Sequence, residues 1–321
     1  MATAKRILIS GAGGFIGRWS VPPLLTRGYE VHALLSDDAR SRSVPAQLAA
    51  AAVHYGDLFD PTSVEKLCAA VRPTHLLHFA WIATPRLYAL SAENFAWVAA
   101  SLHLLRTFHQ HGGTRAVLAG SCAEYDWSRV DVCREGSSAL ATSAAAGSTP
   151  YAICKLALQE MLASFGSHYG LSSASGRIFF PFGPYEHPER LVPSVVRKLL
   201  SDQQAPCSHG RQVRNFLHVA DVGDAFAALL DSDLQGPVNI GSSERISIAA
   251  LVGRIATLIG RPDLLRLGAR AAGANEPAVL VPDVHRLYDE VGWRPRFTLE
   301  DGLADTIAWW QGMLTRGTAA E

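Results

Sequence analysis

The sequence has few lysines, no closely spaced cysteine pair and no long apolar run. Only four of its 29 basic residues are lysines: Lys5, Lys66, Lys155 and Lys198. The five cysteines are odd in number and no two have C-x-x-C spacing, which argues against a disulfide framework or a zinc site and predicts a reducing, cytoplasmic location. No apolar run approaches the roughly 18 residues that span a bilayer, so no membrane partner is expected.

An excess of charge of one sign is also absent. The 29 basic residues are balanced by 29 acidic ones, with neither a basic stripe nor an acidic tail. Because nucleic-acid binding needs clustered positive charge, a nucleic acid polymer is not an expected partner. The first ten residues lead into a strand-like segment without a signal-peptide pattern.

The first half of the chain alternates short apolar segments with longer helical patterns. Nearly continuous apolar strands are typical of parallel sheets covered on both faces, and alternation with helices predicts right-handed crossovers. The sequence therefore predicts an α/β fold with a Rossmann-type doubly wound parallel sheet. The expected strands lie at 6–11, 30–35, 74–80 and 115–121 and within 51–58, and the expected helices at 14–28, 91–113 and 148–162.

The character of the sequence changes after residue 180. Residues 181–193 are rich in proline and aromatic side chains, which predicts an ordered loop that lines a site. A helix is expected at 218–232 and a strand at 236–241. We expect a dinucleotide-binding domain at 1–180, rejoined by 215–242, and a smaller mixed α/β C-terminal substrate lobe made of 181–214 and 243–321.

A glycine-rich turn follows the first expected strand, with Gly11, Gly14 and Gly17 in G-x-x-G-x-x-G spacing. Glycine is needed where the chain turns sharply and approaches a pyrophosphate, and the N-terminus of the next helix then faces the phosphates. The turn predicts a dinucleotide site that includes Phe15 and Ile16; an ordinary tight turn is the alternative.

Two further positions bear on the same cofactor. Asp57, which precedes Leu58 after the third strand, is placed to accept a hydrogen bond from an adenine amino group, with a simple cap as the alternative. The second strand ends without an acid, and Ser36 and Arg40 follow it, which suits a 2′-phosphate and favours NADP(H). Asp37 could instead bind a ribose 2′-hydroxyl, so NAD(H) stays open.

Tyr151 and Lys155 lie four residues apart on an expected helix and therefore share one face. A tyrosine with its ordinary pKa of about 10 is a poor acid–base group at neutral pH, and a neighbouring ammonium would lower that pKa. Ser121 ends the fifth strand, at the sheet edge where open α/β folds bind ligands. We predict that these three residues are catalytic, against the alternatives of a surface pair and a cap.

With these motifs the chain resembles the extended short-chain dehydrogenases/reductases that act on nucleotide sugars as epimerases, dehydratases and ketoreductases. The resemblance also rests on His78-Phe79-Ala80, on Arg177 to Pro181 and on segments 210–222 and 238–243. It implies that Lys155 also holds the nicotinamide ribose and that Phe79, Ala80 and Pro181 line the cofactor. It implies a nucleotide-diphosphate sugar as substrate and a homodimer formed through helices 91–109 and 151–165.

The residues beside the triad separate the branches of this family. The 4,6-dehydratases carry an Asp-Glu pair after the catalytic serine or threonine, where this chain has Cys122 and Ala123. The 4-epimerases have an asparagine at the position of Phe180. They have a second asparagine at the start of a long helix, where this chain appears to have Trp97. The resemblance therefore favours NAD(P)H-dependent reduction of a 4-keto-6-deoxy sugar at C4. A 4-epimerase with retained NAD is the alternative. A non-catalytic NADP(H) sensor is a further alternative, from another functional class.

Arginine forks match phosphate oxygens, so the expected diphosphate ligands are arginines of the second half. No metal ligand is predicted. The candidate substrate-binding residues are Trp81, Cys122 (as a packed thiol), Tyr185, His187, Arg190 and Arg214.

Overall fold

The computed structural model describes residues 5–145, 147–273 and 276–317. Its central element is a seven-stranded sheet with the order β12-β7-β5-β4-β1-β2-β3, and all of its strand pairs are parallel. The predicted doubly wound parallel sheet is therefore confirmed. The strands are β1 (Arg6–Ser10), β2 (Glu30–Leu35), β3 (Ala52–Tyr55), β4 (His75–His78), β5 (Arg115–Ser121), β7 (Ser172–Ile178) and β12 (Gly236–Ile240).

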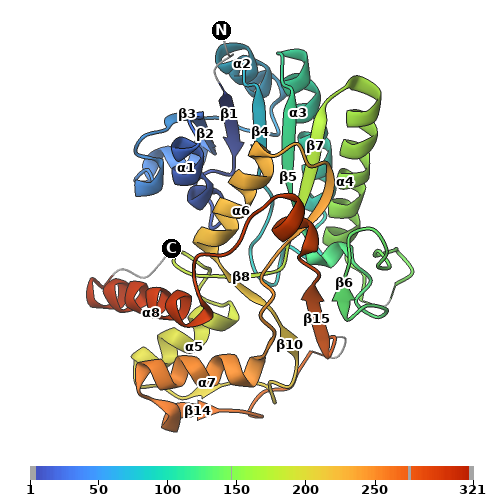
Figure 1. The fold of residues 1–321 in the computed structure, drawn as a ribbon. Helices are drawn as coiled ribbons and strands as arrows, with labels where there is room; N and C mark the ends of the chain where they lie inside the picture. Colours follow the sequence, from blue (N-terminus) through green and yellow to red (C-terminus); the bar gives the residue numbers. More distant parts are fainter. Residues whose placement is uncertain (1–4, 146, 274–275, 318–321) are drawn as a thin grey trace.

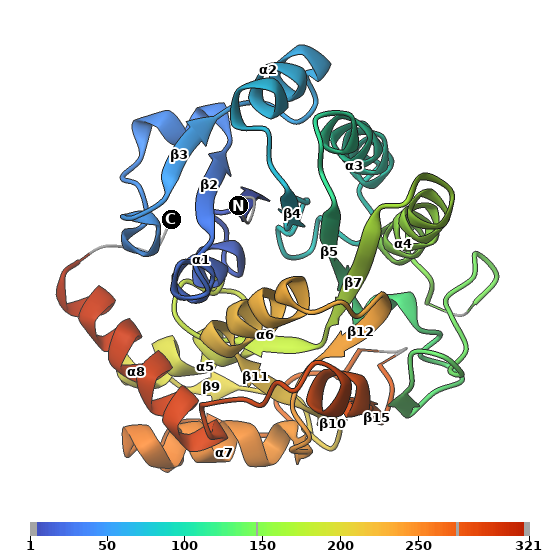
Figure 2. The same cartoon turned by 45° about the horizontal axis from the view of Figure 1, so that its top comes forward.

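Helices cover both faces of this sheet (Figures 1 and 2). Alternate residues of β1 divide between the two layers, as a strand's two-residue side-chain period requires: Ile7 and Ile9 join one apolar cluster and Leu8 the other. One face carries α1 (Gly17–Thr26) and α6 (Val219–Asp231), and the other carries α2 (Pro61–Val71), α3 (Glu93–Gln110) and α4 (Pro150–Tyr169).

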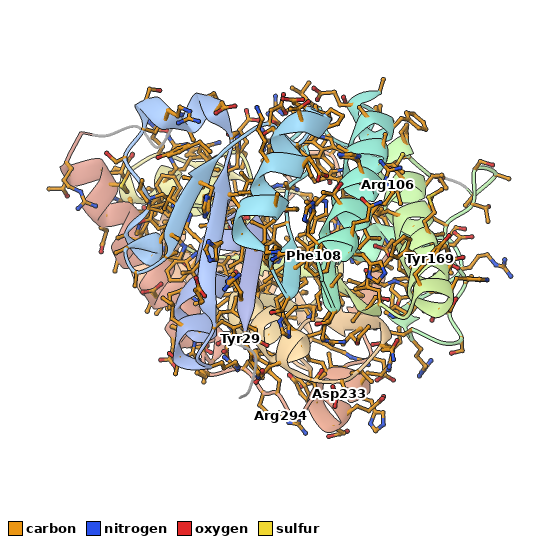
Figure 3. All side chains as sticks on the ribbon, turned by 90° about the horizontal axis from the view of Figure 1, so that it is seen from above. Tyr29, Arg106, Phe108, Tyr169, Asp233 and Arg294 are labelled. Atoms are coloured by element: carbon orange, nitrogen blue, oxygen red, sulfur yellow. The ribbon has the colours of Figure 1, made fainter. Side chains whose placement is uncertain are left out.

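Side chains fill the space between the sheet and its helices (Figure 3). Phe108 of α3 is fully buried in the cluster that α3 shares with α2 and α4. Arg106 and Tyr169 are exposed on the outer side of the same helix layer. This packing fixes α4 against β5 and β7, and α4 carries two of the predicted catalytic residues.

The second half of the chain adds a smaller body below the sheet in Figure 1. Helices α5 (Leu191–Leu200), α7 (Ile248–Ile259) and α8 (Leu299–Thr315) share an apolar cluster that includes the buried Trp310. Short strands complete this body: β6 (Val132–Cys133), β10 (Val213–Arg214), β13 (Ile246–Ser247) and β15 (Val279–Pro282) in one sheet, and the pairs β8 (Phe180–Phe182) with β11 (Phe216–His218) and β9 (Ala205–Pro206) with β14 (Leu265–Arg266). The predicted domain boundaries stay a prediction, and their outermost residues 1–4 and 318–321 lie outside the described residues.

Some element ends differ from the sequence predictions for local reasons. The helix expected from residue 14 begins at Gly17, because the glycine turn occupies the preceding residues. The helix expected at 148–162 continues to Tyr169 and ends at Gly170, which adopts the left-handed conformation common at helix ends. The loop expected at 181–193 contains the end of β8 and the start of α5.

Candidate active site

Ser121, Tyr151 and Lys155 meet at the carboxyl end of β5, where the first two turns of α4 pass the sheet edge. Ser121 is the last residue of β5 and begins the short helix η3 (Cys122–Glu124). Thr149 caps α4 by accepting a hydrogen bond from the Ala152 backbone N–H, and Pro150 occupies the first turn. The Tyr151 N–H donates to the Ala89 carbonyl at 3.2 Å.

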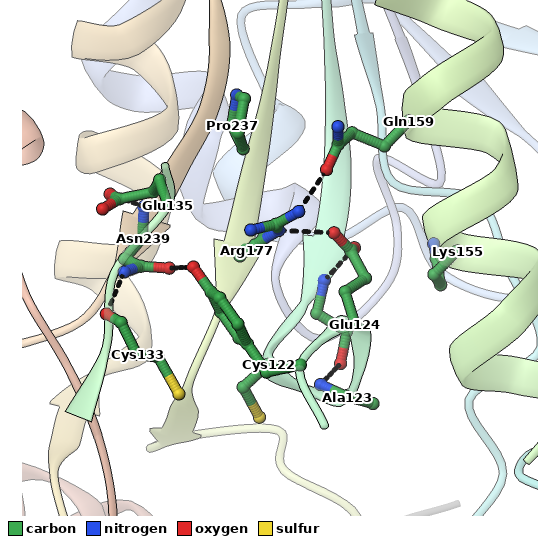
Figure 4. A network of polar contacts seen from close by, with 12 residues as sticks. Cys122, Ala123, Glu124, Cys133, Glu135, Lys155, Gln159, Arg177, Pro237 and Asn239 are labelled. Atoms are coloured by element: carbon green, nitrogen blue, oxygen red, sulfur yellow. Dashed lines mark hydrogen bonds and ion pairs between the residues drawn. The ribbon is translucent and has the colours of Figure 1, made fainter. Parts of the chain in front are cut away.

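A buried polar network holds the turn after Ser121 (Figure 4). Glu124 accepts a hydrogen bond from the Ser121 N–H at 2.8 Å, and its other carboxylate oxygen lies 2.6 Å from Arg177 Nε. The Arg177 guanidinium also donates to Gln159 of α4. Sequence reasoning missed Glu124 and Gln159, although Ser-x-x-Glu is a capping-box pattern that could have indicated Glu124.

The electrostatics of the two titratable residues differ from the simple expectation. Burial raises the pKa of the Tyr151 phenol, and a hydrogen bond with Ser121 opposes this. Burial lowers the pKa of Lys155 to about 7, against the opposing effect of the Glu124 carboxylate. The Lys155 ammonium donates to the Ala119 carbonyl at 2.9 Å and lies 3.8 Å from the centre of the Trp81 ring. The predicted lowering of the Tyr151 pKa by Lys155 is therefore wrong for this structure, because burial has the largest effect on the phenol and the Lys155 ammonium donates to the Ala119 carbonyl.

The glycine turn has the geometry that a dinucleotide pyrophosphate needs. Gly11 has φ +70°, and a Cβ there would lie 2.7 Å from the Ala80 backbone nitrogen. A Cβ on Gly17 would lie 2.2 Å from the Gly11 carbonyl oxygen. Side chains at these positions would block the turn that brings the N-terminus of α1 to the end of β1. The residues present thus fit the phosphates of a dinucleotide.

The remaining predicted cofactor residues surround this turn. Gly14 donates its N–H to the Gly11 carbonyl, and Ile16 accepts a hydrogen bond from the Trp19 N–H at 3.0 Å, one residue after the half-buried Phe15. Phe79 packs edge-on against Phe226, next to Ala80. Pro181 lies in β8, opposite Leu217.

At the expected adenine end, the polar side chains already have partners. Asp57 accepts a hydrogen bond from the Phe59 N–H at 2.8 Å, and Leu58 is buried beside it. Ser36 is the extended residue before the short helix η1 (Asp37–Ser41). Within η1 Arg40 pairs with Asp37 at 2.9 Å and lies over the Tyr55 ring.

Three of the predicted substrate residues lie close to the triad. Trp81 covers Lys155. Cys122 is buried among apolar side chains, and burial raises its pKa to about 12, so its thiol stays protonated. Arg190 lies 5.3 Å from the ring centre of Tyr88, whose ring packs edge-on against Tyr151 at 4.8 Å.

The other three lie elsewhere or are already paired. Tyr185 stacks with Arg18 of α1 at 4.1 Å and contacts Trp309 of α8. His187 is exposed and accepts a hydrogen bond from the Glu189 N–H. Arg214 is 3% exposed and donates to Glu276 and to the Pro277 carbonyl.

The structure corrects the interpretation of the long helix near the site. Trp97 does not open this helix, because α3 begins at Glu93 and Trp97 lies one turn further on. The buried residue at the opening is Asn94, which sequence reasoning missed. An asparagine does therefore stand at the start of the helix, and one of the two arguments against an epimerase loses its basis.

A parallel sheet with a dinucleotide-type glycine turn after β1, and a serine, tyrosine and lysine at its carboxyl edge, defines a nicotinamide-dependent enzyme class. The chain belongs to the NAD dependent epimerase/dehydratase family, whose model matches residues 7–241. The predicted family is therefore confirmed.

The names of individual relatives give two different activities. The chain is 28% identical to dTDP-glucose 4,6-dehydratase of Xanthomonas campestris pv. campestris over 179 residues, which make up 53% of this chain and 51% of that protein. The match thus spans about half the length of this relative. UDP-glucose 4-epimerase of Corynebacterium glutamicum is 26% identical over 332 residues, covering 94% of this chain and 96% of that protein. The crystal structure of the UDP-glucose 4-epimerase of Thermus thermophilus with NAD is 26% identical, has a TM-score of 0.76 and covers 96% of this chain and 99% of that one.

The described residues also lack a membrane-spanning helix and a metal-binding cluster of side chains. No helix among them is both long enough and apolar enough to cross a membrane. Among the same residues, no group of three or more histidine, cysteine, aspartate or glutamate side chains could hold a metal ion.

Proposed function

We propose that this protein reduces a nucleotide-linked 4-keto-6-deoxy sugar at C4. The proposal depends on one observation: Ser121, Tyr151 and Lys155 lie together at the end of β5, and Cys122 and Ala123 follow Ser121 in the sequence. A sugar 4,6-dehydration needs an additional acid and base, and neither a buried neutral thiol nor an alanine supplies them. Hydride and proton transfer at a single carbon needs only the three residues present.

The roles of the side chains follow from their chemistry. A bound reduced nicotinamide supplies the hydride that the C4 carbon accepts. Tyr151 donates its phenolic proton to the oxygen that becomes the C4 hydroxyl, and Ser121 holds this oxygen by a hydrogen bond. Lys155, as an ammonium, stabilises the phenolate that remains on Tyr151 and binds the ribose hydroxyls of the cofactor.

For the diphosphate of the substrate we propose Arg214 and Arg190 as ligands. The guanidinium of Arg214 is buried on β10 and is paired with Glu276 at 3.2 Å. A diphosphate would compete with this carboxylate for the same donors. Arg190 precedes α5 and reaches over Tyr88 towards the triad.

For the cofactor we propose NADP(H), with NAD(H) as the alternative. Ser36 and Arg40 at the end of β2 support a 2′-phosphate. The ion pair of Arg40 with Asp37 supports NAD(H), because it neutralises the arginine, and so does the NAD bound to the Thermus relative. Titration of the purified protein with NADP⁺ and NAD⁺ separates the two, since the preferred cofactor binds with the lower Kd.

A 4-epimerase with retained NAD is the second candidate. Asn94 at the opening of α3 and the epimerase relatives that cover nearly the whole chain favour it. A non-catalytic NADP(H) sensor is the candidate of another class, and the complete Ser121, Tyr151 and Lys155 set argues against it.

We also propose a cytoplasmic homodimer formed through α3 and α4. These two helices pack side by side on one face of the sheet (Figure 2). Phe95 of α3 and Met161 of α4 are exposed apolar side chains on this layer. Sedimentation of the purified protein tests the dimer, and Met161→Glu should yield the monomer.

The deciding experiment follows the nicotinamide absorbance at 340 nm with NADPH or NADH and a set of nucleotide 4-keto-6-deoxy sugars. Loss of absorbance in proportion to sugar reduced, abolished by Tyr151→Phe, supports the ketoreductase. Isomerisation of a nucleotide sugar with no net change in absorbance means an epimerase. Tight cofactor binding without turnover of any sugar overturns both and supports the sensor.

A further inference from the structure

The indole of Trp81 forms a wall over the Lys155 ammonium. The Nζ atom lies 3.8 Å from the ring centre, which is well within the distance at which a cation is attracted to an aromatic face. Lys155 is 6% exposed, so little water competes with this contact. The same ammonium donates to the Ala119 carbonyl of β5 at 2.9 Å. The lysine head group thus contacts both a strand carbonyl and an aromatic ring.

The indole is itself fixed in place. Its Nε1–H donates to Asn94 Oδ1 at 2.8 Å, and Asn94 is fully buried. The Asn94 amide donates in turn to the carbonyls of Tyr88 and Ser91 at 2.6 and 2.8 Å. The Trp97 ring also stacks with the Trp81 ring, with ring centres 6.1 Å apart and planes 28° apart. Rotation of the Trp81 ring would break the bond to Asn94 and leave buried polar groups unpaired, which is costly.

The other charged and titratable groups near Lys155 do not take over this role. Among the described residues Lys155 has no ion pair with a carboxylate. The charge of Glu124, in η3, raises the pKa of Lys155 without a direct contact, and Glu124 is itself paired with Arg177. His78 of β4 is buried between the hydroxyls of Ser10 and Ser101, at 2.6 and 2.7 Å. Burial and the nearby Lys155 lower the pKa of His78 to about 3, so it is neutral at working pH.

We propose that Trp81 is a positioning residue for Lys155. The aromatic face of Trp81, which Asn94 fixes in place, keeps the lysine head group charged and directs it towards the cofactor ribose and Tyr151. An ammonium has three N–H donors. The Ala119 carbonyl accepts from one of them and the indole covers part of the head group, which leaves the remaining donors for the ligand side. The inference rests on the proposed function, because that function gives Lys155 its role at the ribose and the tyrosine. It adds that the lysine depends on an aromatic residue from the loop after β4.

The first test measures the protonation of Lys155 in the cofactor-free protein, where no substrate is required. Lysine labelled with ¹³C at Cε gives four signals, since the chain has four lysines, and Lys155→Arg identifies the relevant one by its loss. Both Trp81→Leu and Trp81→Phe lose the indole N–H bond to Asn94 and keep an apolar cover, and only Trp81→Phe keeps an aromatic face, so the comparison isolates that face. We expect proton binding at Lys155 to weaken about tenfold in Trp81→Leu and to change less than twofold in Trp81→Phe. The exposed Lys66 serves as the internal reference and should not change.

Each other outcome overturns the proposal. An unchanged titration of Lys155 in Trp81→Leu means that the ring does not act on the ammonium. Stronger proton binding means that Trp81 only excludes water. If the leucine variant does not fold, Trp81→Met provides the same comparison with a larger apolar side chain.

The second test asks whether the positioning affects catalysis. In the absorbance assay, the basic limb of the pH profile of kcat should shift to lower pH in Trp81→Leu, in the direction of the Lys155 titration, and stay in place in Trp81→Phe. A parallel loss of kcat in both variants, without a shift, would assign a merely structural role to Trp81. Failure of every substrate in the wild type would refute the proposed function and leave the titration result standing.

Discussion

Glu124 and Arg177 form an ion pair that is closed to solvent, and this pair ties the turn after Ser121 to β7. The Arg177 Nε lies 2.6 Å from a Glu124 carboxylate oxygen, and the two side chains are 1% and 0% exposed. The second Glu124 oxygen accepts a hydrogen bond from the Ser121 N–H. The position of Ser121, which we propose to be catalytic, therefore depends on a charge pair between residues 53 positions apart in the chain.

Removing one partner of this pair should destabilise the fold strongly. Glu124→Ala leaves the Arg177 charge buried without compensation, which typically costs about 3–5 kcal/mol. The matched control is Glu244→Ala, which breaks the exposed pair of Glu244 with Arg254 at 3.1 Å and should cost at most about 1 kcal/mol. Urea unfolding followed by circular dichroism measures both. Equal losses in the two variants would contradict the structural role of the buried pair.

The two glycines that end β1 and α1 should respond differently to the same substitution. Gly11 and Gly28 both have positive φ angles, +70° and +79°. A Cβ on Gly11 would meet the Ala80 nitrogen at 2.7 Å, whereas a Cβ on Gly28 has no atom within 4 Å. Gly28→Ala should cost about 1 kcal/mol from backbone strain and leave cofactor binding intact. Gly11→Ala adds a backbone clash and should reduce affinity for NADP⁺ or NAD⁺ at least tenfold, as measured by calorimetric titration.

Glu186 should make the fold less stable as the pH rises. Burial raises the pKa of its carboxyl to about 8, against the opposing effects of Arg190 and of the Gly183 backbone. An unfolded glutamate has a pKa near 4.3, so the unfolded chain loses this proton first. The contribution of protonated Glu186 to the free energy of unfolding is therefore fully present below about pH 4. This contribution falls by roughly 1.4 kcal/mol per pH unit between about pH 4 and about pH 8.

Glu186→Gln removes this dependence and should be more stable than the wild type at pH 7 by about 4 kcal/mol. The control is Glu189→Gln in the same loop, where the carboxylate is exposed and paired with Arg86. Urea unfolding of the wild type and both variants at pH 5 and pH 7 gives the comparison. A wild type and Glu186→Gln with parallel pH dependence would show that Glu186 is ionised in the folded protein.

Local patterns in the sequence predicted the parts of the site that short segments encode. The Gly11 to Gly17 spacing and the Tyr151 to Lys155 spacing each lie within one turn or helix, and their meaning does not depend on distant residues. The partners across the fold were not predictable in this way. Nothing in the sequence around Trp81 indicates that its ring meets a lysine 74 positions later.

The exact start of α3 was missed for a related reason. Its N-cap, Ala92, has no side chain that could mark the beginning of the helix. The helical pattern of apolar residues therefore left the boundary open by several residues, and the polar Asn94 did not stand out. Its importance comes only from burial and from its bonds to Trp81 and the Tyr88 carbonyl. Such contacts require the tertiary structure.

Tyr88 should affect turnover through its contact with Tyr151, the proposed proton donor. Its ring packs edge-on against Tyr151, with ring centres 4.8 Å apart and planes at 87°. Such a pair contributes about 0.5–1.5 kcal/mol, so Tyr88→Leu should lower kcat by up to about tenfold through a less well ordered Tyr151, with little change in the KM for the cofactor.

Tyr88→Phe keeps the ring and should retain most of the activity. Tyr169→Leu is the matched control, because this exposed tyrosine lies at the opposite end of α4. The absorbance assay at saturating cofactor compares the three variants with the wild type. An equal loss in Tyr88→Phe and Tyr88→Leu would assign the effect to the Tyr88 hydroxyl, and with it a contact to the substrate in place of ring packing.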